Sequence, residues 1–128
     1  MRPLVGTLAL LGAALMLSAC DTDRPAADRS ELRVVGGDPE RGKRTYVQYG
    51  CGTCHTAPGV RGPQGKVGPP LTHFAERSYI GGQLPNRPDA LVRFLQDPPA
   101  LIPGTAMPDM GVNEQEARDI AAFLYTLD

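Results

Sequence analysis

The sequence contains no tryptophan, and only three cysteines and two histidines are available to bind a metal ion. A structural zinc site needs a closed set of cysteine and histidine ligands. Cys51, Cys54 and His55 could supply part of such a set, but only His73 is left over to complete it, which disfavours zinc. The formal net charge of -1 likewise gives no electrostatic reason to expect a nucleic-acid partner.

The apolar run from Leu4 to Leu17 is too short for a comfortable transmembrane helix. It follows Arg2 and has the length of the hydrophobic region of a secretory signal. The run ends at Leu17-Ser18-Ala19-Cys20, which resembles a bacterial lipobox, a signal in which the cysteine carries lipid. We therefore predict a lipoprotein signal peptide over residues 1–19 and lipidation of Cys20. The alternatives are an ordinary signal peptide cut near Ala19 and an uncleaved anchor.

Residues 20–37 are polar and show no sustained periodicity, so we expect a flexible tether after the lipidated cysteine. Residues 38–128 are few enough for a single domain. In some Gram-negative bacteria, an aspartate such as Asp21 after the lipidated cysteine favours retention at the inner membrane. We expect export, with lipid anchoring to the outer, periplasmic face of the bacterial cytoplasmic membrane.

The run Cys51-Gly52-Thr53-Cys54-His55 has the C-x-x-C-H pattern typical of covalent attachment of a c-type haem. Two thiols on one helical turn can add to two vinyl groups along one haem edge, and the histidine can then bind the iron. A thioredoxin-like C-x-x-C would follow a strand, and no strand pattern precedes this one. We predict one covalent haem c, with Cys51 and Cys54 as its thioether residues and His55 as an axial ligand.

Capping residues and apolar periodicity predict three helices, over residues 38–50, 87–97 and 113–127. The first begins at the N-cap Asp38, and the third begins at Asn113, with a glutamate three residues later to complete a capping box. The segments between them are rich in glycine and proline, and loops of that length in a small domain are expected to surround something. We predict an all-α fold of three to four short helices and long loops wrapped around the haem.

Met107, Met110 and His73 are the candidates for the second axial ligand of the iron. Met107 lies in Pro103-Gly104-Thr105-Ala106-Met107-Pro108, where prolines on both sides stiffen the loop that presents its sulfur. We predict Met107 as the ligand and keep Met110 and His73 as alternatives. Two filled axial positions leave little room for a substrate, which favours electron transfer over catalysis.

From residue 38 to its end, the chain resembles the class I cytochromes c. Gly42 and Tyr46 match the glycine and the aromatic residue of that family's first helix, and Ile120 and Phe123 match its C-terminal helix. The resemblance implies that these two helices cross, with a close approach at Gly42. It also implies the small all-α fold of the family, built around a single haem.

The run Gly68-Pro69-Pro70-Leu71 resembles the G-P-x-L loop of the same family. There the proline carbonyl accepts a hydrogen bond from the axial histidine, so the resemblance implies that Pro69 orients His55. It further implies a haem-propionate environment made by Arg77, Asn86 and Thr105. Phe94 departs from the family, because many relatives have there a tyrosine whose hydroxyl reaches the methionine sulfur.

The run from Gly68 to Ala75, followed by Leu84-Pro85-Asn86, resembles the cytochrome c domain of subunit II of caa3-type oxidases. This resemblance implies a membrane-anchored electron carrier between a quinol-oxidising complex or donor cytochrome and a terminal oxidase. A fixed haem-relay subunit of a larger redox complex is one alternative, and a haem peroxidase or gas sensor is another. The single C-x-x-C-H run, early in the domain, disfavours a di-haem peroxidase and a cytochrome c′-type gas binder.

Overall fold

The structure is a computed structural model, and it describes residues 29–127. Its α-helices are α1 (Pro39–Gln48), α2 (Pro88–Gln96), α3 (Pro98–Leu101) and α4 (Glu114–Leu124), and short 3-10 turns occur at Arg29–Leu32, Cys51–Thr53 and Phe74–Glu76. The predicted signal peptide, Cys20 and the first part of the predicted tether lie outside the described residues. Within residues 29–127, no helix is long and apolar enough to cross a membrane.

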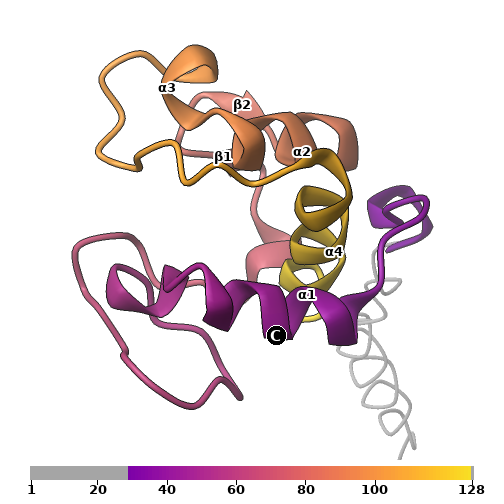
Figure 1. Cartoon of the computed structure of the whole chain (residues 1–128). Helices are drawn as coiled ribbons and strands as arrows, with labels where there is room; N and C mark the ends of the chain where they lie inside the picture. Colours follow the sequence, from indigo (N-terminus) through magenta and orange to yellow (C-terminus); the bar gives the residue numbers. More distant parts are fainter. Residues whose placement is uncertain (1–28, 128) are drawn as a thin grey trace, which may run out of the picture.

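The predicted all-α class is confirmed, with one small addition. Strands β1 (Tyr79–Ile80) and β2 (Leu84–Pro85) pair in antiparallel register, Tyr79 with Pro85 and Ile80 with Leu84. Strands this short cannot show an alternating pattern, so the sequence did not predict them. Figure 1 shows these strands beside α2 and α3 in one half of the molecule, while α1 and the loop after it form the other half.

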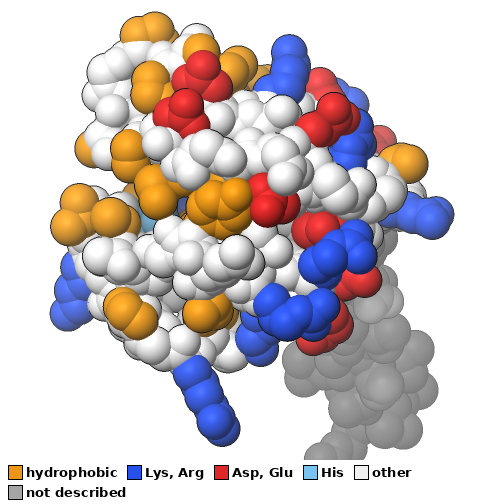
Figure 2. All heavy atoms as spheres, viewed as in Figure 1, with side chains coloured by type: hydrophobic (Ala, Val, Ile, Leu, Met, Phe, Trp, Pro, Cys, Tyr) orange, Lys and Arg blue, Asp and Glu red, His pale blue; other side chains and the backbone are white. Residues whose placement is uncertain are grey.

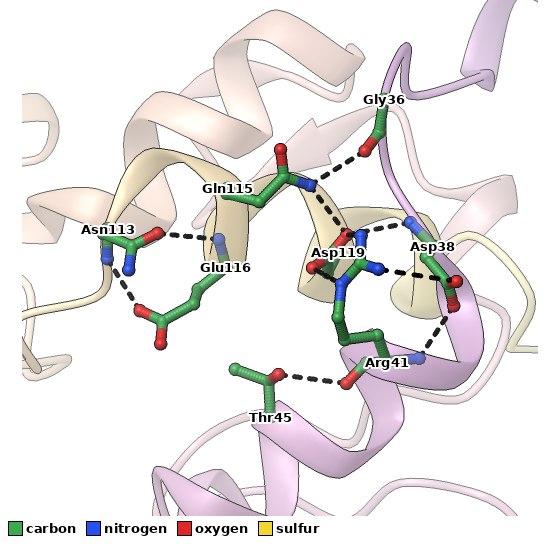
Figure 3. Close-up of polar contacts among 8 residues, drawn as sticks. All are labelled: Gly36, Asp38, Arg41, Thr45, Asn113, Gln115, Glu116 and Asp119. Carbon is green, nitrogen blue, oxygen red and sulfur yellow. Dashed lines mark hydrogen bonds and ion pairs between the residues drawn. The ribbon is translucent and has the colours of Figure 1, made fainter.

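The helix ends follow the capping chemistry expected from the sequence. The Asp38 carboxylate accepts a hydrogen bond from the Arg41 N–H at 2.8 Å, and Pro39 occupies the first turn of α1. Asn113 and Glu116 form the predicted capping box at the start of α4, with both of its hydrogen bonds at 3.0 Å. Figure 3 shows this box beside the contacts between α1 and α4.

Helix α3 has a start that the sequence did not predict. The pair Pro98-Pro99 ends α2 as expected, because proline lacks the N–H that would continue the helix. Proline is nevertheless tolerated in a first turn, and here Pro98 begins a new one. The Asp97 carboxylate caps that turn by accepting a hydrogen bond from the Ala100 N–H at 3.1 Å.

Helices α1 and α4 cross, as the resemblance implied, and the crossing depends on the glycine in α1 (Figure 1). A Cβ atom added at Gly42 would lie 1.9 Å from the carbonyl oxygen of Asp119 in α4. One turn further along α1, the ring of Tyr46 packs edge-on against Phe123, with centroids 5.6 Å apart. Ile120, which follows Asp119 in α4, is only 1% exposed.

A buried carboxylate ties the start of α1 to α4 (Figure 3). Asp119 is 1% exposed, and its carboxylate accepts hydrogen bonds from the Asp38 N–H at 2.9 Å and from Arg41 Nη2 at 2.8 Å. Gln115 Nε2 donates to the same carboxylate at 3.1 Å. Burial raises the pKa of Asp119, but the hydrogen bonds from Arg41, Asp38 and Gln115 outweigh it, and the pKa lies below its usual value.

The packed region starts before the predicted domain boundary at residue 38. Val34 is 7% exposed and belongs to the core. Side chains of α4 bind the backbone on either side, because Arg118 donates to the Val35 carbonyl at 3.2 Å and Gln115 donates to the Gly36 carbonyl at 2.9 Å. Residues 29–37, which the sequence suggested as the end of a tether, therefore lie against α4. These contacts are made by one buried side chain and by backbone carbonyls. Because such contacts leave no periodic pattern in the sequence, the sequence did not predict them.

Candidate functional site

The cysteine pair lies directly after α1. Gly50 adopts a φ of 68°, a left-handed conformation that suits glycine, and turns the chain from α1 into the 3-10 turn at Cys51–Thr53. Cys51 and Cys54 are free and half-buried. Burial raises the pKa of the Cys51 thiol to about 11. The pair therefore follows a helix and lacks the strand that a thioredoxin-like site requires.

His55 is held in one orientation and one tautomer. Its Nδ1 lies 2.8 Å from the carbonyl oxygen of Pro69, the contact that the resemblance implied. Because a carbonyl can only accept, Nδ1 must carry the proton, which leaves the lone pair of Nε2 available to a metal ion. A backbone partner of this kind also fixes the plane of a metal-binding imidazole.

The loop that carries Pro69 is fixed to the cysteine turn by backbone hydrogen bonds. Gly65 N–H donates to Gly52 and Gly68 N–H donates to Cys54, both at 2.8 Å, and Leu71 N–H donates to Thr56 at 2.7 Å. Gly68 lies against the imidazole, since a Cβ atom there would be 2.3 Å from His55 Cε1. The sequence suggested Gly68 only as part of a motif. The structure shows why a glycine is needed there, because a side chain would collide with the imidazole of His55.

Among the three candidates for the second axial ligand, the structure distinguishes Met107. It is half-buried and packs against the hydrophobic core. Met110 is 42% exposed on the surface. The side chain of His73 is 66% exposed and lies 3.8 Å from Glu76. Of these three candidates, Met107 alone therefore packs against the hydrophobic core.

Asn86, one of the three residues expected near the haem propionates, forms hydrogen bonds within the protein. Asn86 Nδ2 donates to the carbonyls of Phe74 at 2.9 Å and Arg77 at 3.0 Å, so neither amide hydrogen is left for a propionate. Its oxygen accepts from the Tyr125 hydroxyl at 2.9 Å, a partner that sequence reasoning missed. The propionate role that the resemblance implies for Asn86 stays a prediction. Asn86 instead orders the segment before α2.

Arg77 and Thr105 also make local contacts. The Arg77 guanidinium donates to the carbonyls of Pro70 and Thr72 and lies 5.5 Å above the ring of Phe74. It thus fixes the loop that follows the Pro69 contact. The Thr105 hydroxyl oxygen accepts a hydrogen bond from the Met107 N–H at 3.2 Å, which leaves its own hydrogen free to donate. Thr105 therefore orders the methionine loop and keeps a donor for a second partner.

These side chains fit a covalently attached haem better than a metal ion alone. No group of three or more His, Cys, Asp or Glu in residues 29–127 could hold a metal ion. Two free thiols on one turn could instead attach a c-type haem, and an imidazole with an available Nε2 and a half-buried thioether could bind its iron. Figure 2 shows a hollow between the two halves of the molecule, with hydrophobic side chains gathered along it.

Together, this fold and these ligands define a mono-haem c-type cytochrome. Residues 39–128 match the Cytochrome c family. Cytochrome c2 of Rhodomicrobium vannielii is 30% identical over an alignment of 139 positions, which covers 93% of each protein. This chain belongs to the cytochrome c family. Its fold is also that of the solved cytochrome c2 of Rhodobacter sphaeroides, with a TM-score of 0.53 and 23% identity over 71% of this chain and 96% of the other.

A second relative is a subunit of an oxidase and is much longer than this chain. Cytochrome c oxidase subunit 2 of Alkalihalophilus pseudofirmus is 33% identical over 90 residues, which cover 68% of this chain but 25% of that subunit. This chain thus spans about a quarter of the oxidase subunit's length. Membership of the family confirms the predicted haem c, the role in electron transfer and the need for redox partners.

Proposed function

We propose that this chain is a lipid-anchored mono-haem cytochrome that delivers single electrons to a terminal oxidase. Cys51 and Cys54 would hold the haem by thioether bonds, and His55 and Met107 would bind its iron. The observation that carries this assignment is the contact between His55 Nδ1 and Pro69, because it orients the imidazole and leaves Nε2 for the iron. The haem supplies a one-electron Fe(III)/Fe(II) couple.

The surrounding residues keep the two axial ligands in place. Gly68 and Pro69 confine the ring of His55 on one side. The hydrogen bond from the Met107 N–H to the Thr105 hydroxyl orders the loop that carries the methionine. A methionine ligand raises the reduction potential relative to a second histidine. The site is therefore suited to accepting electrons from a quinol-oxidising complex or a donor cytochrome.

The oxidase partner is supported by the similarity of 68% of this chain to part of an oxidase subunit. The lipid anchor is supported by the lipobox-like run that ends at Cys20. We expect the periplasmic face of the cytoplasmic membrane as the location. Replacing Cys20 with Ser should release the cytochrome into the soluble periplasmic fraction. If the variant stays in the membrane pellet, the anchor is not the lipid.

The assignment of the axial ligands is tested by near-infrared magnetic circular dichroism of the oxidised holoprotein. A charge-transfer band typical of histidine–methionine ligation is expected, and Met107→Ala should abolish it and lower the reduction potential. Met110→Ala is the matched control and should retain both. A bis-histidine or high-spin signal in the wild type would overturn the assignment of Met107.

The oxidase partner is tested by reconstitution with purified oxidases. Reduced cytochrome should be oxidised rapidly by an oxidase that lacks its own cytochrome c domain, and the Met107→Ala variant should be slow. A fixed relay subunit would behave differently, because it would remain in a complex after extraction with mild detergent. Recovery of the cytochrome only within such a complex would contradict the role of a mobile carrier.

A further inference from the structure

Tyr46 has a buried hydroxyl that the fold does not use. The residue is 2% exposed, and among residues 29–127 its hydroxyl is the only buried side-chain oxygen or nitrogen without a hydrogen-bond partner. The Tyr49 hydroxyl donates to Glu116 at 2.7 Å, and the Tyr125 hydroxyl donates to Asn86 at 2.9 Å. Tyr79 is 58% exposed and reaches solvent. A buried hydroxyl without a partner is costly and calls for an explanation.

The hydroxyl end of this ring lies at the cysteine turn. One edge of the ring packs against Phe123 in α4, at an interplanar angle of 63°. Ring atom Cε1, which is bonded to the carbon that carries the hydroxyl, lies beside Gly52, because a Cβ atom there would be 4.0 Å away. Gly52 is buried between Cys51 and Cys54. The hydroxyl is thus close to the segment that attaches the haem.

Packing between the two helices does not require this hydroxyl. The edge-on contact with Phe123 uses only the ring, and a phenylalanine would make it without burying a polar atom. The only chemical group that Tyr46 adds is a hydrogen-bond donor beside the two thiols. Once a thiol has added to a vinyl group, its sulfur can only accept a hydrogen bond.

We propose that Tyr46 is a further residue of the haem site, whose hydroxyl donates a hydrogen bond to a thioether sulfur formed at Cys51 or Cys54. The inference rests on the proposed attachment of the haem to these cysteines. A donor at that edge draws electron density from the haem and stabilises the Fe(II) form. Hydrogen bonds around a redox cofactor shift its reduction potential in this way. Tyr46 therefore raises the reduction potential of the cytochrome.

The test compares Tyr46→Phe with Tyr49→Phe in the mature holoprotein, by redox titration of each. Tyr49→Phe is the matched control, because it removes a tyrosine hydroxyl three residues further along, at the C-cap of α1. That hydroxyl already has a partner, since it donates to Glu116 in α4. The reduction potential of Tyr46→Phe should fall below that of the wild type, while that of Tyr49→Phe should not move. An unchanged potential in Tyr46→Phe would overturn the proposal.

A crystal structure of the wild-type holoprotein provides a second readout, which does not depend on whether the variant matures. The Tyr46 hydroxyl should lie within hydrogen-bond distance of a thioether sulfur. A buried water or a backbone carbonyl as its only partner would refute the inference. The pyridine haemochrome spectrum separates this failure from that of the proposed function, because a wild-type protein without c-type haem would refute the attachment site itself.

Discussion

Replacing Gly42 with Ala tests the crossing of α1 and α4. Alanine is favoured over glycine within a helix by about 1 kcal/mol, so propensity alone predicts a gain in stability. The added Cβ would lie 1.9 Å from the backbone oxygen of Asp119, which no side-chain rotation can relieve. Overpacking of this kind costs about 3 kcal/mol at the upper end of its usual range. Separating the helices also weakens the Tyr46–Phe123 contact, for about 1 kcal/mol.

The expected net loss for Gly42→Ala is therefore about 3 kcal/mol in the free energy of unfolding. For a domain of this size, that corresponds to roughly 12–24 °C in the melting temperature. Thermal unfolding of the oxidised holoprotein, followed by far-ultraviolet circular dichroism, measures it. Arg44→Ala, on the exposed face of the same helix, is the control and should change stability by less than about 0.5 kcal/mol. If Gly42→Ala is as stable as the wild type, α1 and α4 do not approach each other at Gly42 as closely as the structure indicates.

Further predictions concern the ring of His55, the buried carboxylate of Asp119 and Phe94, where many relatives have a tyrosine. Gly68→Ala should displace the ring of His55 and alter the electron paramagnetic resonance g-values of the oxidised haem; identical spectra would contradict the packing. Asp119→Asn should cost about 1–3 kcal/mol at neutral pH, measured by denaturant unfolding. The pKa of Asp119 is lower in the folded protein than in the unfolded chain. Its carboxylate therefore stabilises the fold at pH values above the ordinary aspartate pKa of about 3.9, and this stabilisation is lost as the pH falls below that value. The wild type should therefore lose more stability on acidification than Asp119→Asn, and parallel pH profiles would refute this. Phe94→Tyr should change the reduction potential if its hydroxyl reaches the Met107 sulfur, and an unchanged potential would exclude that contact.

The parts of the fold that could be predicted are those encoded by neighbouring residues. The capping box at Asn113 and the N-cap at Asp38 depend on residues a few positions apart, and both were correct. The start of α3 at Pro98 was missed because proline both ends one helix and permits the next. The hairpin was missed because its strands are too short for a pattern.

The candidate site was predictable where a motif joins residues close in sequence. The sequence identified His55 and Pro69 through two short motifs, and the structure brings them into contact. The hydrogen bonds of Asn86 with Phe74, Arg77 and Tyr125 could not be predicted, because no motif joins these residues. The resemblance thus implied the hydrogen bond between His55 and Pro69 but gave no indication of the partners of Asn86.

The small size of the domain explains why glycines determine so much of its architecture. Gly42 lets two helices touch, Gly65 lies against the carbonyl of Thr53, and Gly68 lies against the ring of His55. At each point a side chain would separate segments that must be close for the ligands to converge. A domain with few large side chains gains rigidity from such backbone contacts rather than from a large core. Rigid ligands suit electron transfer, because the iron can then change its charge with little movement of the atoms that bind it.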